Sequence, residues 1–216
     1  MKKLLFLFLF INSVIQAQRQ SILWERTFGG SDNEDATSIC FERNGLCLVL
    51  GSSSSVDGDI SGHLSSVGDR DFWFCRIDSL GTLLYDKSFG GSYNDDSGQL
   101  IKVKIGGYIM CGNTSSDDID VSGNHSLSSD IWLAKIDDSL NIEWQTCLGS
   151  TMLEWGFHVS ESIDSNYFFL GSTVGNDSDV SGNHGDRDNW LGKVDRNGTL
   201  LWQLCLGSPD HESGGS

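Results

Sequence analysis

The sequence predicts an all-β fold, and three observations lead to this prediction. Short apolar segments that alternate with polar residues recur along the chain, and clusters of Gly, Asn, Asp and Ser separate them. Glycine occurs 26 times and proline once, so no proline-rich linker divides the chain. Long amphipathic helical windows are missing, and 216 residues suffice for one domain with a sizeable core.

The N-terminus has the pattern of a secretory signal peptide. Lys2 and Lys3 precede an apolar run from Leu4 to Ile11, and small and polar residues follow up to Ala17. We therefore expect residues 1–17 to be removed and residues 18–216 to be exported. The apolar run is shorter than the roughly 20 residues that a membrane helix needs, and no later stretch approaches that length, so we expect no membrane span.

An internal repeat is the strongest signal in the sequence. One aromatic-led motif begins at Trp24, Tyr85, Trp144 and Trp202, as in "WERTFGGSDNED" and "YDKSFGGSYNDD". A second motif, "DFWFCRID", "DIWLAKID" and "DNWLGKVD", has the same period of about 60 residues. Two independent markers with one period indicate repeated structural units rather than chance similarity.

Each period contains four expected strands, which in the first copy span 36–41, 46–51, 72–77 and 83–89. The first two strands are joined by "ERNG" and the last two by "DSLG", and both sequences are typical of tight hairpin turns. Four antiparallel strands per repeat describe a blade of a β-propeller. We expect three blades, at about 36–89, 97–148 and 156–206.

An additional strand over 22–28 precedes the three blades and has no blade of its own. Propellers have about four to eight blades, so the sequence predicts an incomplete propeller with an orphan N-terminal strand. We expect the missing blades to come from a longer chain of which this sequence is a fragment. The alternatives are an open arc, or an oligomer that completes the ring.

The repeat resembles the bacterial β-propeller repeat proteins sometimes called SBBP repeats. The matching stretches are "FGGSDNED", "GLCLVLGSSSS" and "DFWFCRIDSLGTLLY" with their later copies, and they cover nearly all of residues 22–212. The chain departs from the family at "DGDISG", "DIDVSG" and "DSDVSG", and Leu140 replaces the turn glycine of the other copies. The resemblance implies an extracellular, mostly non-catalytic scaffold and supplies no ligand.

The charge balance excludes one class of partner. The chain has 30 acidic and 14 basic residues, a formal net charge of −16. Nucleic-acid binding requires clustered Lys and Arg, so we expect no nucleic-acid partner. A strongly acidic surface permits a cation, although solvation alone also explains it.

The acidic loops of the three repeats are candidate calcium sites. Oxygen-bearing side chains at alternate positions before a glycine resemble the first half of an EF-hand loop. The candidate ligands are Asp57, Asp59, Ser61, Asp118, Asp120, Ser122, Asp177, Asp179, Ser181 and, at the twelfth position of the third loop, Asp188. The alternative is an Asx-rich turn, in which the same side chains accept hydrogen bonds from nearby backbone N–H groups.

Cysteine and histidine residues give weaker signals. Cys75, Cys111, Cys147 and Cys205 occupy positions where the other copies have small or apolar residues, so we expect buried free thiols. Cys40 and Cys47 flank the "ERNG" turn and would lie opposite each other, which makes a disulfide an open alternative.

His63, His125 and His184 follow the acidic loops, and a shared metal or acid–base site among them is the alternative to three separate structural residues.

The third strand of each repeat has a regular pattern on both faces. Trp73, Trp132 and Trp190 alternate with small and aliphatic residues, as packing between blades requires. On the opposite face, a basic residue (Arg76, Lys135 or Lys193) precedes an aspartate (Asp78, Asp137 or Asp195) by two positions. We expect ion pairs within the blade and turn hydrogen bonds from these groups.

These observations predict a secreted or cell-surface, non-catalytic module that binds a protein or a glycan or serves as a scaffold. Catalytic residues cannot be assembled from spacing, and Asp-x-x-Gly-x-x-x-Trp at Asp195–Trp202 is a folding turn in the enzyme propellers that have it. Two alternatives stay open. One is a hydrolase or lyase propeller whose catalytic residues lie outside this chain, and the other is a calcium-stabilised adhesion module.

Overall fold

The computed structural model describes residues 22–42, 44–66, 68–126 and 128–212, and this part of the chain is all-β. The expected signal peptide lies outside the described residues. No helix in the described ranges is long and apolar enough to cross a membrane.

In the described ranges, twelve strands form three four-stranded antiparallel sheets, and each sheet has its strands in chain order. Sheet 1 contains β1 (Glu34–Phe41), β2 (Cys47–Ser53), β3 (Asp71–Ile77) and β4 (Leu83–Phe89). Sheet 2 contains β5 (Asp95–Lys102), β6 (Tyr108–Thr114), β7 (Asp130–Ile136) and β8 (Ile142–Leu148). Sheet 3 contains β9 (Glu154–Glu161), β10 (Tyr167–Thr173), β11 (Asp188–Val194) and β12 (Leu200–Leu206). The predicted strands of the first repeat agree with β1–β4 to within two residues at each end.

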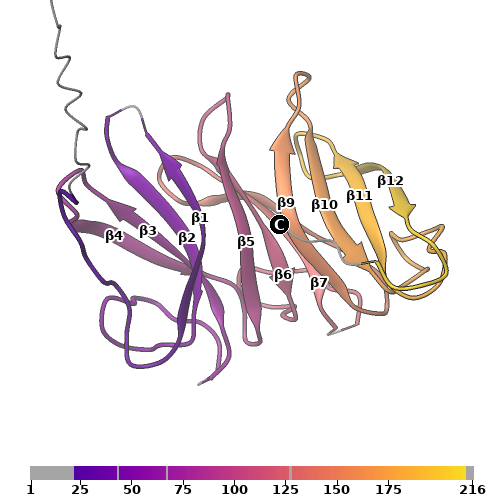
Figure 1. The fold of residues 1–216 in the computed structure, drawn as a ribbon, viewed down its shortest axis with the longest axis horizontal. Helices are drawn as coiled ribbons and strands as arrows, with labels where there is room; N and C mark the ends of the chain where they lie inside the picture. The colour runs from indigo at the N-terminus through magenta and orange to yellow at the C-terminus, as the bar shows by residue number, and fades with distance from the viewer. Residues whose placement is uncertain (1–21, 43, 67, 127, 213–216) are drawn as a thin grey trace, which may run out of the picture.

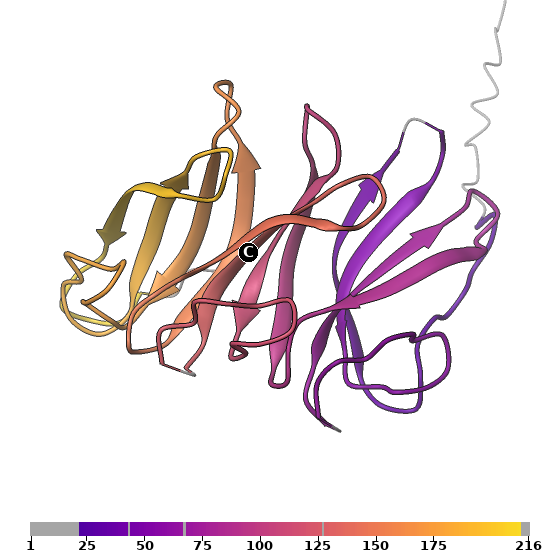
Figure 2. The same ribbon diagram turned by 180° about the vertical axis from the view of Figure 1, so that it is seen from behind.

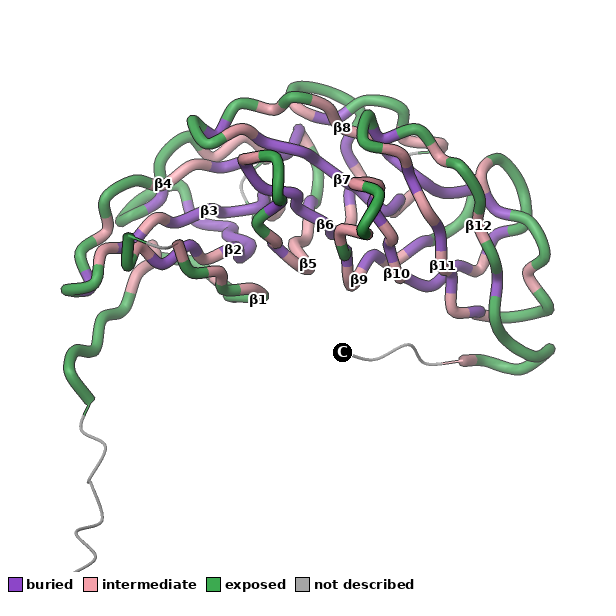
Figure 3. The backbone as a smooth tube through the Cα atoms, turned by 90° about the horizontal axis from the view of Figure 1, so that it is seen from above, coloured by how far each residue is buried: buried purple, intermediate pink, exposed green. Residues whose placement is uncertain are grey.

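The three sheets pack face to face, one after another, in a curved row (Figure 1, and from behind in Figure 2). From above, the first strands β1, β5 and β9 lie along the concave side of the arc, and β4, β8 and β12 lie toward the convex side (Figure 3). Each first strand has a register shift near its middle, at Ala36/Ser38, at Ser97/Gln99 and opposite Leu170/Gly171. Such bulges bend and twist a strand.

The hydrophobic core lies between neighbouring sheets. One buried cluster joins sheet 1 to sheet 2, where the Phe72 and Trp132 rings lie 4.9 Å apart. A second cluster joins Ile131 and Leu133 of sheet 2 to Tyr167 and Trp190 of sheet 3. The predicted role of the tryptophans in packing between units is confirmed, since Trp132 and Trp190 are fully buried.

The predicted strand over 22–28 is wrong, because this segment forms no sheet ladder. Its side chains nevertheless contact sheet 1: the Trp24 indole N–H donates to the Ser79 carbonyl oxygen at 3.0 Å, and Phe28 packs against the cluster around Trp73. A strand requires backbone hydrogen-bond partners, and none of the described strands pairs with these residues.

The turns between third and fourth strands use an aspartate, as predicted. Asp137 Oδ1 accepts hydrogen bonds from the backbone N–H groups of Ser139 and Asn141, both at 2.8 Å. The predicted ion pairs within the repeats are confirmed. Lys135 Nζ lies 2.7 Å from Glu143, and Lys193 Nζ lies 2.7 Å from Asp164, each within its own repeat, while the turn aspartates accept the backbone N–H groups.

The cysteines are all free thiols in the described chain, so the disulfide alternative is wrong. Cys47 is paired in register with Phe41, and Cys40 is paired with Leu48. Neighbouring positions on a strand point to opposite faces, so the two thiols lie on different sides of sheet 1. Burial raises the pKa of Cys111 to about 12 and that of Cys205 to about 11, which keeps these thiols protonated and inert.

Candidate functional site

The acidic loops run between the second and third strands of each sheet and return to the segment that precedes the first strand. The first aspartate of each loop accepts a backbone hydrogen bond there. Asp57 Oδ1 accepts from Ser31 N at 2.8 Å, Asp118 Oδ1 from Ser92 N at 2.7 Å and Asp177 Oδ1 from Thr151 N at 2.8 Å. Donation by the Thr151 hydroxyl and by the Thr151 backbone N–H lowers the pKa of Asp177.

The second aspartate of each loop binds the first glycine of the aromatic-led motif that precedes its sheet. Asp59 Oδ2 accepts from Gly29 N at 3.1 Å, and the backbone N–H of Asp59 donates to the Gly29 carbonyl oxygen at 3.0 Å. Asp120 with Gly90, and Asp179 with Gly149, form the same two contacts. The repeat therefore contains one reciprocal Asp–Gly contact per sheet.

The serine of each loop contacts the fourth strand of its own sheet. Ser61 Oγ donates to Asp86 Oδ1 at 2.9 Å. Gln145 Nε2 donates to Ser122 Oγ at 2.7 Å, and Gln203 Nε2 donates to Ser181 Oγ at 2.6 Å.

The candidate calcium ligands therefore do not converge on one point. The first aspartate, the second aspartate and the serine of each loop bind three different partners, and the described residues contain no group of three or more His, Cys, Asp or Glu side chains that could hold a metal. Asp188 is buried at the start of β11, and its Oδ2 accepts from the backbone N–H of His184 at 3.1 Å. The geometry fits the Asx-turn alternative, and the calcium sites stay a prediction that this geometry does not support.

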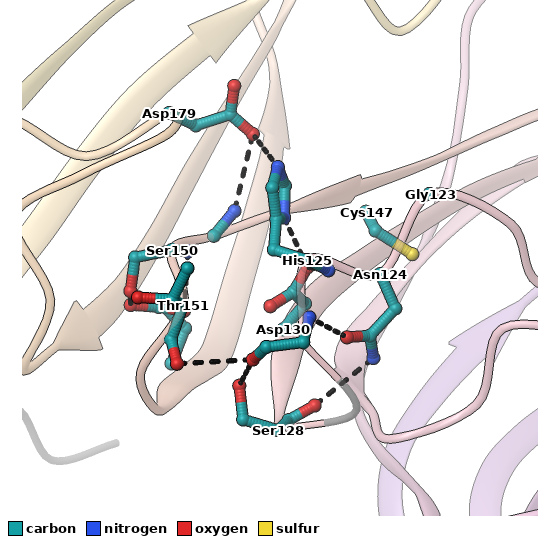
Figure 4. A network of polar contacts seen from close by, with 12 residues as sticks. Gly123, Asn124, His125, Ser128, Asp130, Cys147, Ser150, Thr151 and Asp179 are labelled. Atoms are coloured by element: carbon teal, nitrogen blue, oxygen red, sulfur yellow. Dashed lines mark hydrogen bonds and ion pairs between the residues drawn. The ribbon is translucent and has the colours of Figure 1, made fainter.

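Each of the three histidines contacts the aspartate that begins the third strand of its own sheet. His125 Nδ1 lies 2.6 Å from Asp130 Oδ2, and its Nε2 lies 3.4 Å from Asp179 of the next loop (Figure 4). His184 contacts Asp188 at 2.7 Å, and His63 contacts Asp71 at 3.2 Å. The histidines do not meet at a common site, so the shared-site alternative is wrong.

The network around His125 contains two groups whose pKa values are raised. Burial raises the pKa of Asp130 to about 6, and the charge of Glu154 adds to this shift while His125 opposes it. The pKa of His125 is also raised. Burial acts against this rise, but the hydrogen bond and charge of Asp130 and the charges of Asp179 and Glu154 outweigh it.

A second acidic side chain lies beside each of the three aspartates that begin β3, β7 and β11, at the glycine that follows the fourth strand of the sheet. A Cβ added to Gly149 would stand 2.4 Å from Asp130 Oδ1 and 2.7 Å from Glu154 Oε2, so both carboxyl groups lie against one glycine Cα. The same arrangement brings Asp71 and Asp95 to Gly90, and Asp188 and Glu212 to Gly207. We call these three pairs the junction carboxyl pairs.

Sequence reasoning missed the junction carboxyl pairs, although a signal for them exists. Asp71, Asp130 and Asp188 each stand two residues before the repeated tryptophan, and an acidic residue stands five positions after the Gly90 and Gly149 motif glycines. Only the stacking of one sheet on the next brings these two series together.

The concave side of the arc holds an open groove of about 540 Å³ between β1, β5 and β9. Hydroxyl and amide groups line much of it, among them Ser38, Gln99 and Asn113, together with His158. Two of these groups already stabilise the bulged backbone, since Gln99 Oε1 accepts from Val159 N at 2.8 Å and Asn113 Oδ1 accepts from Gly156 N. Ile39 and Phe157 also line the groove, so it combines apolar surface with hydrogen-bonding groups.

Comparisons with known proteins do not assign the chain to a family. No protein-family model matches the chain, and no curated protein matches it. The resemblance to SBBP repeats therefore stays a prediction from the sequence.

Proposed function

We propose that the chain is a secreted or cell-surface, non-catalytic β-propeller module that binds another macromolecule or serves as a scaffold. The observation that carries this proposal is the repetition of one junction. Sheets 1 and 2, and sheets 2 and 3, join through the same apolar positions, the same Asp–Gly contacts and the same carboxyl pairs. Repeated face-to-face units around an axis are the architecture of a propeller.

Residues 22–28 support the propeller proposal from the other end of the arc. The Trp24 ring covers Gly81 in the turn of sheet 1, just as the Trp144 ring of β8 covers Gly198 in the turn of sheet 3. Gly29 then accepts from Asp59 N in the way that Gly149 accepts from Asp179 N. The segment thus takes the place of the fourth strand of a further blade beside sheet 1.

The free face of sheet 3 favours a binding or scaffolding role. Phe89 of sheet 1 and Leu148 of sheet 2 are buried against the next sheet, whereas the equivalent Leu206 is 47% exposed. Trp202 and Leu204 on the same strand are also exposed. A contiguous apolar surface of this kind marks a contact site for another protein surface.

The acidic loops support a structural role for the rims. Their oxygen atoms stabilise backbone turns, so the loops are rigid supports that present their exposed residues to a partner. The residues that would bind a protein or a glycan lie in these rims and in the concave groove.

Sedimentation velocity of the purified chain over a range of concentrations tests the proposal. We expect concentration-dependent association of the wild-type chain, and a monomer for the variant that combines Leu204→Lys with Leu206→Lys. A matched control variant, Leu84→Lys on the exposed part of β4, should associate like the wild type. A wild-type chain that stays monomeric throughout, or a double variant that associates equally, would contradict a contact role for this face.

A further inference from the structure

The junction carboxyl pairs are unusual because their buried oxygen atoms lack partners. Asp71, Asp95, Asp130 and Glu154 are all fully buried. Oδ1 of Asp71, of Asp95 and of Asp130 accepts no hydrogen bond in the described structure. A buried carboxylate oxygen without a partner is costly, so such a group favours its protonated form.

The remaining oxygen atoms of the pairs are fixed by hydrogen bonds. Asp95 Oδ2 accepts from Gly91 N at 2.7 Å and from Ser116 Oγ at 3.0 Å. Glu154 accepts from the backbone and hydroxyl of Ser150 and from Thr173. The two carboxyl groups of a pair therefore cannot turn away from each other when both are charged.

No lysine or arginine forms an ion pair with these four groups in the described ranges of the chain. The groups that face the Asp71–Asp95 pair are His63 from the loop of sheet 1 and Asp120, which binds Gly90. The Asp130–Glu154 pair is faced by His125 from the loop of sheet 2, by Asp179 beyond that imidazole and by the Cys147 thiol of β8.

We propose that the Asp71–Asp95 and Asp130–Glu154 pairs are proton-binding latches between neighbouring sheets. Each pair holds one proton in mildly acidic surroundings and has one net negative charge. When the pair loses this proton, two buried negative charges lie against the same side of one glycine, and their repulsion loosens the junction. The stability of the arc then depends on pH through the contacts between sheets rather than through any single sheet.

The direction of the shifts agrees with this mechanism. Burial raises the pKa of Asp95 to about 7, with the charge of Asp71 adding to the rise, and burial raises the pKa of Asp71 as well. A folded-state pKa above the unfolded value means that the stabilisation is fully present below the unfolded pKa. It is lost as the pH rises through about 6 to 7, the folded values of Asp130 and Asp95.

Thermal unfolding of the full chain at about pH 5 and about pH 8 tests the latch. We expect the wild type to melt at a higher temperature at the lower pH. Asp130→Asn places an amide where the protonated acid would stand, since an amide nitrogen can donate toward Glu154 without titrating. This variant should melt higher than the wild type at the upper pH and have a smaller difference between the two pH values. Asp95→Asn is a second, independent variant of the other junction and should behave in the same way.

Two controls separate the latch from other titrations. Asp32→Asn removes an exposed carboxylate and should leave the pH difference unchanged. His125→Gln removes an imidazole whose raised pKa acts in the same direction, and most of the pH difference should survive it. The latch is refuted if His125→Gln abolishes the difference while Asp130→Asn keeps it, or if both Asn variants lose equal stability at the two pH values.

Discussion

Strands β7 and β11 have nearly the same sequence and occupy the same place in their sheets, yet their environments differ. β7 reads "DIWLAKI" and is buried at every residue, whereas β11 reads "DNWLGKV" and alternates between buried and half-buried positions. The reason is their neighbours: within the residues that the structure describes, sheet 2 has a sheet on each side, and sheet 3 has a sheet on one side. The same pattern of side chains is thus a two-sided core in one repeat and a half-covered surface in the next.

Exchanging the residues that differ between these strands should give the largest difference in the free energy of unfolding. Ile131 is fully buried against sheet 3, and Asn189 is its half-buried equivalent. Ile131→Asn removes apolar packing and buries an amide without partners, so we expect a loss of about 3–5 kcal/mol. Asn189→Ile should change the free energy of unfolding by about 0.5 kcal/mol or less. Urea denaturation of both variants measures the two effects.

Equal losses in the two variants would show that the free face of sheet 3 is as tightly covered as the junction between sheets 2 and 3. A stabilising Asn189→Ile that also promotes association would instead identify this face as a contact surface.

The turns between third and fourth strands give a second, smaller contrast. Gly81 and Gly198 have positive φ angles of 80° and 86°, and the Trp24 and Trp144 rings cover them. Leu140 holds the same turn position with a φ of 62°, and its side chain is buried among sheets 1 and 2. The fourth strand of sheet 1 supplies the smaller Tyr85 at the tryptophan position, so the leucine fills space that an indole fills elsewhere.

Leu140→Gly should therefore be destabilising even though it relieves the backbone. The lost burial costs about 2–5 kcal/mol, and a positive φ for a non-glycine residue costs about 1 kcal/mol, so we expect a net loss of about 1–4 kcal/mol. Combining it with Tyr85→Trp should restore part of this loss, because the indole would cover the new glycine. Chemical denaturation of the single and double variants decides the question, and a double variant no more stable than Leu140→Gly would refute the explanation.

The smallest expected effect concerns calcium. Because the loop carboxylates already accept backbone hydrogen bonds, we expect added calcium and added chelator to leave the melting temperature unchanged. Differential scanning calorimetry in either condition measures this. Asp118→Asn keeps an acceptor for Ser92 N and should give the same null response. A rise in melting temperature with calcium that Asp118→Asn abolishes would instead confirm the calcium-stabilised alternative.

Residue patterns alone led to most of the fold. Twelve of the thirteen expected strands are correct. They follow from the period of about 60 residues, the alternation around Trp132 and the Asp-containing turns. The same reasoning failed at residues 22–28 and at Cys40 and Cys47. An alternating sequence forms a strand only where a neighbouring strand supplies backbone hydrogen bonds. Two thiols can pair only when the strand register places them opposite each other, and a shift of one residue moves them to different faces.

The sequence by itself determined the elements that depend on local chemistry: alternating side chains form strands, glycine and aspartate form turns, and the repeat sets their order. The tertiary structure alone decided which residues meet across the sheets. Asp130 and Glu154 stand 24 positions apart and become a buried pair only because one sheet stacks on the next. Burial and the charge of a neighbour depend on that stacking, and they are what shift the pKa values and leave one face of sheet 3 open.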